Sequence, residues 1–162
     1  MDFTIKNKIC VLIAKRCSGK SIFLKKLVND VKDDFDKIFC ICPTEEVNNF
    51  YKKSGIVEPN YIFDNYSEKF GDALIKKMTE VNKDKNSNEL KHVLLILDDC
   101  IADVNLRTSP SLKKIFVRGR HIGISIICTS QNLCSLSPLE RNNSDFISVS
   151  YTHLTLPTKR IV

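Results

Sequence analysis

Short, continuously apolar runs alternate along the chain with longer stretches in which apolar side chains recur every three or four residues. The first pattern predicts buried strands, and the second predicts helices with one apolar face. The predicted strands are Lys8–Ala14, Lys37–Cys42, Tyr61–Phe63, Lys91–Leu97, Gly123–Thr129 and Phe146–Ser150. The predicted helices are Gly19–Val31, Thr44–Lys53, Ser67–Val81 and Ser109–Val117. This alternation predicts an α/β domain with a mostly parallel sheet that is flanked by helices on both faces.

Local signals support several of these boundaries. Thr44 and Ser67 stand where an N-cap is expected, and Pro110 falls at the first position of its helix. The polar stretch Asn82–Asn88 indicates a surface loop between the third helix and the next strand.

The last twelve residues, Tyr151–Val162, do not continue the alternation. They resemble the translated sequencing-adapter read-through that ends many metagenomic reading frames, and a processing scar of this kind is left out of fold reasoning. We therefore expect one domain over residues 1–150, truncated at its C-terminus, followed by a non-native tail over residues 151–162. The alternative is a genuine terminal strand.

Composition places the chain among globular domains. Its 162 residues are 43% apolar and 27% charged, which suits one domain with one core. The longest apolar runs, Ile9–Ala14 and Val93–Leu97, are far shorter than the ~20 residues that span a bilayer. No charged-then-apolar leader opens the chain, so we expect neither a secretory signal nor a membrane span. The net charge of +6 permits a polyanionic partner without demanding one.

The seven cysteines are odd in number and include no C-x-x-C pair. Four lie inside apolar strand-like runs, where a thiol behaves as a small apolar side chain: Cys10, Cys40, Cys42 and Cys128. Zinc would require paired ligands at short spacing, so we expect no cysteine metal site. Buried free thiols indicate a reducing, intracellular compartment.

The stretch Ala14–Ser21 reads A-K-R-C-S-G-K-S and fits the phosphate-loop pattern [AG]-x-x-x-x-G-K-[ST]. It follows an apolar strand and opens a helix, so backbone N–H groups would face the phosphates. In this arrangement Lys20 reaches the β- and γ-phosphates and Ser21 ligates Mg²⁺. The predicted nucleotide-binding residues are Ala14, Lys15, Arg16, Cys17, Ser18, Gly19, Lys20 and Ser21. An ordinary strand–helix turn is the alternative.

Two acids, Asp98 and Asp99, end the apolar strand that begins at Lys91. In an open parallel sheet the carboxyl ends of strands border the ligand site. Asp98 suits the Mg²⁺ shell and Asp99 suits activation of an attacking water. A helix cap or surface acid is the alternative for Asp99. Gln131 ends the next strand and would lie beside both acids if these strands are neighbours. A solvated loop glutamine is the alternative there.

A basic stretch, Arg118-Gly119-Arg120-His121, precedes the strand that ends near Gln131. An arginine here would serve one of three roles: a finger for a neighbouring subunit's γ-phosphate, a contact to nucleic-acid phosphate, or a complement to a helix dipole. The residues alone leave these three roles open.

Taken in order, A-K-R-C-S-G-K-S, L-L-I-L-D-D, R-G-R-H-I-G-I-S-I-I-C-T-S-Q and P-L-E-R-N-N-S-D resemble the genome-packaging ATPases of poxviruses, other nucleocytoplasmic large DNA viruses and virophages. That family belongs to the FtsK/HerA branch of P-loop motors. The resemblance covers Lys8 to about Val149. It implies a RecA-like fold, incomplete at the C-terminus, in which the Gly123–Thr129 strand lies between the Lys8–Ala14 and Lys91–Leu97 strands.

The resemblance also implies roles by position. Gly19, Lys20 and Ser21 match the family's nucleotide loop. Asp98 matches its magnesium acid, and Asp99 its catalytic acid. Gln131 matches its polar sensor. Arg120 and Arg141 match two arginines, either of which is a candidate finger acting between subunits.

The function implied is hydrolysis of ATP, with Mg²⁺, by a homo-oligomeric ring that drives double-stranded DNA into a capsid, with a capsid or portal component as partner. The expected location is the host cytoplasm (the viral factory) or the virion. Two alternatives stay open: a P-loop kinase or other monomeric nucleotide-binding enzyme, and an inactive nucleotide-binding fragment.

Overall fold

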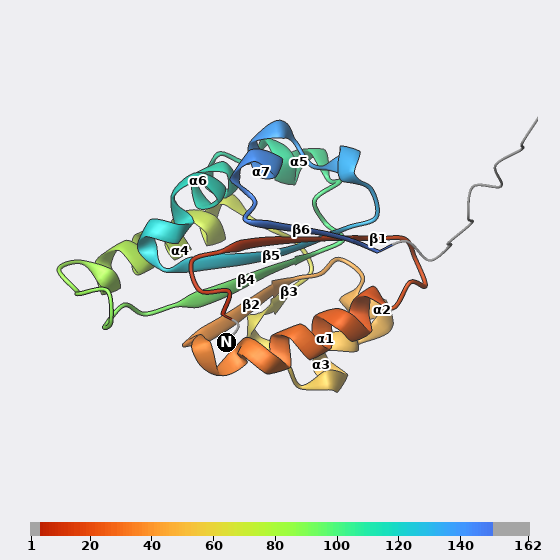
Figure 1. Ribbon diagram of the computed structural model, residues 1–162, viewed down its shortest axis with the longest axis horizontal. Coiled ribbons are helices and arrows are strands. Elements are labelled where there is room, and N and C mark those ends of the chain that lie inside the picture. Colours follow the sequence, from red (N-terminus) through yellow and green to blue (C-terminus); the bar gives the residue numbers. More distant parts are fainter. Residues whose placement is uncertain (1–3, 151–162) are drawn as a thin grey trace, which may run out of the picture.

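A six-stranded parallel sheet with the order β3-β2-β4-β5-β1-β6 forms the centre of the protein in a computed structural model that describes residues 4–150 (Figure 1). Its strands are β1 (Ile9–Ala14), β2 (Lys37–Ile41), β3 (Ile62–Phe63), β4 (Val93–Asp98), β5 (Ile124–Ser130) and β6 (Phe146–Ser150). The helices are α1 (Lys20–Val31), α2 (Glu45–Asn48), α3 (Phe50–Ser54), α4 (Glu68–Asn82), α5 (Val104–Thr108), α6 (Pro110–Arg118) and α7 (Pro138–Asn143). The expected α/β class is confirmed, and the predicted tail over residues 151–162 lies outside the described residues.

The strand order brings three chain segments that are distant in sequence to one edge of the sheet. β5 pairs with β1 on one side and with β4 on the other, all in parallel register. The prediction that β5 separates the two motif strands is therefore confirmed. The carboxyl ends of β1, β4 and β5 meet at Ala14, Asp98 and Ser130, where the loops that carry the candidate chemistry begin.

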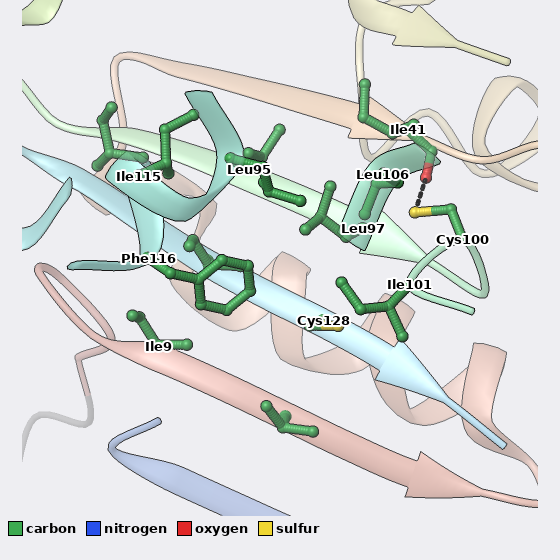
Figure 2. Close-up of a cluster of buried hydrophobic side chains, with 14 of the residues drawn as sticks. Ile9, Ile41, Leu95, Leu97, Cys100, Ile101, Leu106, Ile115, Phe116 and Cys128 are labelled. Atoms are coloured by element: carbon green, nitrogen blue, oxygen red, sulfur yellow. Dashed lines mark hydrogen bonds between the residues drawn. The ribbon is translucent and has the colours of Figure 1, made fainter. Parts of the chain in front are cut away.

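Helices cover the sheet in two layers. Figure 1 shows α4, α5, α6 and α7 on one face and α1, α2 and α3 on the other. Side chains of the central strands alternate between two buried clusters: Leu95 joins Phe116 beneath the first layer, and Ile96 joins Leu24 beneath the second. Figure 2 shows the first cluster. The central strands are thus apolar on both faces, which explains their continuous hydrophobic runs.

Several local features differ from the prediction. The helix expected over Thr44–Lys53 is broken by Asn49, whose φ of 48° is left-handed, so it becomes α2 and α3. Thr44 makes no side-chain cap, whereas Ser67 accepts a hydrogen bond from the Phe70 backbone as predicted. The short helices α5 and α7 were not predicted. β6 is exposed at every residue, unlike the buried central strands.

Within residues 4–150, no helix combines the length and apolar character needed to cross a bilayer.

Candidate nucleotide-binding and hydrolysis site

The loop from β1 to α1 has the backbone form of an anion site. Two residues, Cys17 (φ 59°) and Gly19 (φ 81°), adopt left-handed conformations and turn the chain into the helix. Gly19 is the N-cap and has no side chain to occupy the first N–H groups of α1, and the first turn contains no acid. The Ser18 hydroxyl is buried without a hydrogen-bond partner among the described residues. Free N–H groups and a helix N-terminus favour a phosphate here.

A cavity of about 650 Å³ lies over this loop. The phosphate loop, from Lys15 to Ile22, forms one wall. Thr44 and Asn48 border it from α2 and the loop before it, and Asp99 and Gln131 border it from the ends of β4 and β5. The volume is within the range of small-molecule sites. A smaller cavity of about 410 Å³ lies on the other side of the loop, beside β6.

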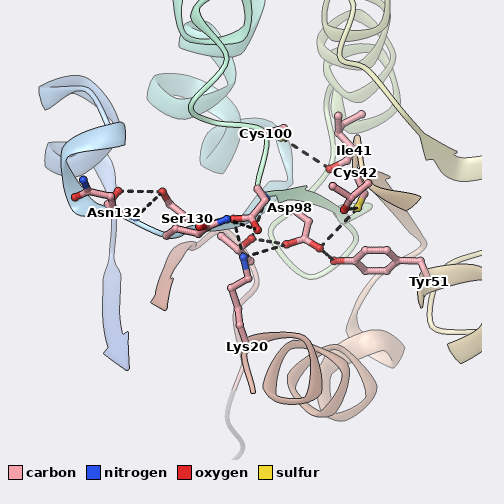
Figure 3. Close-up of polar contacts among 12 residues, drawn as sticks. Lys20, Ile41, Cys42, Tyr51, Asp98, Cys100, Ser130 and Asn132 are labelled. Carbon is pink, nitrogen blue, oxygen red and sulfur yellow. Dashed lines mark hydrogen bonds and ion pairs between the residues drawn. The ribbon is translucent and has the colours of Figure 1, made fainter. Parts of the chain in front are cut away.

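Asp98 ends β4 as a buried carboxylate with a hydrogen bond on each oxygen. The Thr129 hydroxyl donates to Oδ1, and the Tyr51 hydroxyl donates to Oδ2 at 2.8 Å (Figure 3). The Cys42 thiol lies 3.8 Å from Oδ2. Both carboxylate oxygens are therefore fixed by residues of neighbouring elements.

Asp99 follows Asp98 in a left-handed conformation (φ 51°), which turns its side chain toward the phosphate loop instead of along the strand. Lys20 Nζ lies 2.6 Å from Asp99 Oδ1 and 3.9 Å from Asp98 Oδ1. The Gln131 amide donates to Asp99 Oδ2 at 3.3 Å. The structure thus brings Lys20, Asp98, Asp99 and Gln131 together, and Asp99 does not cap a helix, since Asp103 caps α5.

The two candidate arginines lie elsewhere. Arg120 donates to the Asn143 carbonyl at 3.0 Å and pairs with Asp145 at 3.6 Å. These contacts lie at the amino ends of the strands, about 20 Å from the phosphate loop if β1 rises ~3.3 Å per residue. Arg141 lies in α7, half-buried, and its guanidinium has no hydrogen bond or ion pair with the rest of residues 4–150. Neither arginine is among the residues that line the cavity over the phosphate loop.

The protonation of the groups around Asp98 follows from burial. Burial raises the pKa of the Cys42 thiol to about 11, a hydrogen bond from Thr44 lowers it, and the Asp98 charge raises it. Burial also raises the pKa of the Tyr51 phenol well above its usual range, with further contributions from Cys40 and Asp98. Both groups therefore keep their protons at neutral pH and act as donors toward Asp98.

The donor set fits magnesium. The Asp98 carboxylate and the Ser21 hydroxyl offer hard oxygen atoms of the kind that Mg²⁺ prefers. Mg²⁺ is commonly bound through one or two carboxylates together with substrate phosphates. In such a site the protein supplies few ligands, and one carboxylate with one hydroxyl beside a phosphate loop fits that pattern.

The two hydroxyl groups that bond Asp98 come from residues that were not predicted. Thr129 stands one position before Ser130 at the end of β5, so its place beside the acids follows from the strand order once that order is known. Tyr51 is 47 residues from Asp98 in sequence, and no local pattern connects the two.

A parallel sheet with a phosphate loop after β1, acids after β4 and an inserted β5 defines the P-loop ATPase class. Solved structures agree with this fold. The DNA-packaging ATPase B204 from Sulfolobus Turreted Icosahedral Virus matches with a TM-score of 0.62 and 20% identity, covering 92% of this chain and 78% of B204. The B204 NTPase from Sulfolobus turreted icosahedral virus 2, in complex with AMP, matches with a TM-score of 0.65 and 20% identity, over 90% of this chain and 76% of that protein.

The family follows from the sequence comparison. The family model described as Poxvirus A32 protein matches residues 4–153, so the chain belongs to this family. Uncharacterized protein 015R of Frog virus 3 (isolate Goorha) is 26% identical over 145 residues, which cover 90% of this chain and 44% of that protein. Uncharacterized protein L437 of Acanthamoeba polyphaga mimivirus is 31% identical over 165 residues, which cover 91% of this chain and 55% of L437. The chain thus spans about half the length of these viral relatives.

Proposed function

We propose that this domain is the ATP-hydrolysing part of a motor that moves viral double-stranded DNA into a capsid. The observation that carries the proposal is the meeting of Lys20, Asp99 and Gln131 at the ends of three parallel strands, with β5 between β1 and β4. Membership of the Poxvirus A32 protein family and a fold shared with B204, a DNA-packaging ATPase, support the same assignment.

Each residue of the cluster has a chemical task in this proposal. The loop N–H groups and Lys20 hold the triphosphate, as a helix N-terminus and a cation would. Asp99 takes the proton of the attacking water, and Gln131 orients that water because its amide already contacts Asp99. Asp98 and Ser21 would hold Mg²⁺, which neutralises phosphate charge when bound.

An arginine from a neighbouring subunit would complete the site. Arg120 is committed to contacts within its own subunit, whereas the Arg141 guanidinium is free of partners in residues 4–150. We therefore favour Arg141 as the finger that acts between subunits of a homo-oligomeric ring. In this proposal the ring binds a capsid or portal component, and the protein works in the viral factory or the virion. A kinase with directly paired motif strands is disfavoured because β5 separates them.

The test compares ATP hydrolysis by a longer protein that contains this domain, with and without double-stranded DNA. Phosphate release that rises severalfold with duplex DNA, together with one-way displacement of a DNA-bound obstacle, is the expected result. A rate of ATP consumption that does not change with DNA but rises with a small phosphate acceptor would favour the kinase alternative. Nucleotide binding without hydrolysis, in the assembled longer protein, would favour the inactive-fragment alternative.

A further inference from the structure

Asp98 is held by two side chains that approach its carboxylate from opposite sides. The Thr129 hydroxyl donates to Oδ1, and the Tyr51 hydroxyl donates to Oδ2 (Figure 3). Thr129 also accepts a hydrogen bond from the Asp99 backbone N–H at 3.0 Å, so it contacts both acids. Of the two acids, Tyr51 bonds only Asp98. Charge-assisted hydrogen bonds of this kind fix the orientation of a carboxylate as well as stabilising it.

Tyr51 is itself held rigidly. Its side chain is fully buried, at 0% exposure, although it belongs to a helix of only five residues. The buried Glu45 carboxylate accepts the backbone N–H of Tyr51 at 3.1 Å and that of Lys52 at 2.9 Å. Asn49, between α2 and α3, is left-handed (φ 48°), and the Glu45 hydrogen bonds join the first residue of α2 to the start of α3. Glu45 therefore anchors the backbone from which the Tyr51 hydroxyl extends to Asp98.

Packing alone does not account for a tyrosine at this position. The ring packs against the Phe50 ring at 5.1 Å between centroids and within the cluster beneath α1, and a phenylalanine would make the same apolar contacts. What the hydroxyl adds is its hydrogen bond to Oδ2 of Asp98, at 2.8 Å. Thr129 bonds the other oxygen, Oδ1. Apart from Tyr51, the only donor to Oδ2 among the described residues is the Cys42 thiol, 3.8 Å away.

We infer that Tyr51 is a positioning residue that holds the Asp98 carboxylate in the orientation needed to bind a magnesium–nucleotide complex. This inference rests on the proposed function, in which Asp98 is a magnesium ligand. Partners that orient a metal-binding carboxylate commonly matter by about 10–100-fold in metal affinity. Glu45 supports the same arrangement one step further from the metal.

The test is the magnesium dependence of nucleotide binding by Tyr51→Phe, followed with a fluorescent ATP analogue and no turnover. We expect the affinity measured in EDTA to stay within about twofold of wild type. The magnesium concentration that gives half of the full binding enhancement should rise by about 10–100-fold. Saturating magnesium should then restore most of the affinity. Glu45→Gln should shift the same midpoint in the same direction by a smaller factor.

Tyr66→Phe is the matched control. It also removes a tyrosine hydroxyl, but that hydroxyl is only partly buried and bonds Ser111 at 2.6 Å beneath the opposite helix layer. Its magnesium midpoint should equal that of wild type. If Tyr51→Phe folds poorly by urea unfolding, Glu45→Gln supplies the deciding midpoint.

Two results would overturn the inference. One is a magnesium midpoint in the folded Tyr51→Phe and Glu45→Gln variants that equals that of Tyr66→Phe. The other is an affinity loss of the same size with and without magnesium, which would indicate a packing role. If wild type itself binds nucleotide equally well in magnesium and in EDTA, the assignment of Asp98 fails first, and the proposed function fails with it.

Discussion

Lys20 and Asp99 form an ion pair of 2.6 Å between the phosphate loop and the end of β4. Both side chains are largely buried, with 11% and 27% of their surface exposed. The lysine that would bind phosphate is therefore held by the acid that would activate water. In the proposed function, a bound triphosphate would separate these two charges, and the cost of that separation would link nucleotide binding to release of the Asp99 carboxylate as a base.

Asp99→Asn should separate binding from turnover. The amide cannot accept the water proton, so hydrolysis should fall by about 10²–10⁴-fold. Affinity for ATP should stay equal or increase severalfold, because Lys20 loses its charged competitor and one negative charge leaves the cavity. Lys20→Ala is the comparison variant and should lose binding as well. Nucleotide affinity from equilibrium titration and single-turnover phosphate release measure the two effects. Unchanged turnover in Asp99→Asn would remove Asp99 from the role of base.

Substitutions of Arg120 and Arg141 should have different effects: one on stability and the other on hydrolysis. Arg120→Ala removes a hydrogen bond to Asn143 and an ion pair to Asp145, and its side chain is one-third exposed, so unfolding in urea should become easier by about 1 kcal/mol. Arg141→Ala should keep stability and nucleotide affinity but lose about 10³–10⁵-fold in hydrolysis within the assembled longer protein.

Mixing experiments decide between these arginine roles. Arg141→Ala mixed with Lys20→Ala should regain part of the activity, at interfaces that combine an intact loop with an intact arginine. If Arg120→Ala is the variant that stays stable, loses hydrolysis and is rescued by mixing, the assignment is reversed. If either change leaves hydrolysis intact but flattens the salt dependence of DNA binding, that arginine contacts DNA phosphate instead.

His92 should make the fold less stable in mild acid. Burial lowers its pKa, as does the Lys6 charge, while Asp36 and Asp34 act in the opposite direction. A lowered pKa means that the unfolded chain binds the proton more readily than the folded one. Stability should therefore decline as pH falls below about 6.5, the ordinary histidine value, and level off below the folded pKa. Urea unfolding at pH 7.5 and 5.5 measures the change.

His92→Gln should reduce that decline, because the variant has no proton to bind there. The matched control is His121→Gln, since His121 is exposed. An equal decline in wild type and both variants would show that the acid sensitivity arises elsewhere.

Thiol labelling should report nucleotide binding without any hydrolysis. All seven cysteines are free, and five are buried, leaving Cys17 and Cys134 exposed. Burial raises the pKa of Cys10 to about 11, which slows its reaction further. A disulfide reagent at pH 8 should therefore label two thiols quickly and the other five only after unfolding. ATP should protect Cys17, because it lines the phosphate cavity, and should leave Cys134 reactive. Equal protection of both cysteines, or of neither, would contradict this placement of the nucleotide.

The repeating pattern of the central strands was enough to predict most of the fold. β1, β4 and β5 are apolar on both faces, so their strands and their parallel pairing were evident from the hydrophobic runs. The helix break at Asn49 was not evident, because the local sequence contains no glycine or proline that would signal a left-handed turn there. α5 and α7 are too short for a helical period to stand out.

The site divides in the same way. Lys20, Ser21 and the two acids follow from motifs that lie next to strand ends, where parallel strands place ligands. Gln131 needed the strand order, which came from a family resemblance. Tyr51 required the tertiary structure itself, since its partner Asp98 is far away in sequence and its own segment has no distinctive spacing.

The ends of β1, β4 and β5, which meet at one edge of the sheet, have a thermodynamic consequence. A nucleotide bound there would contact segments separated by more than a hundred residues, and no partly unfolded state that has lost one of these strands would retain the full site. Binding energy would then add to the stability of the whole domain, by about 2.7 kcal/mol at a concentration of one hundred times Kd. The melting temperature should consequently rise with ATP concentration, even in a protein that never turns it over.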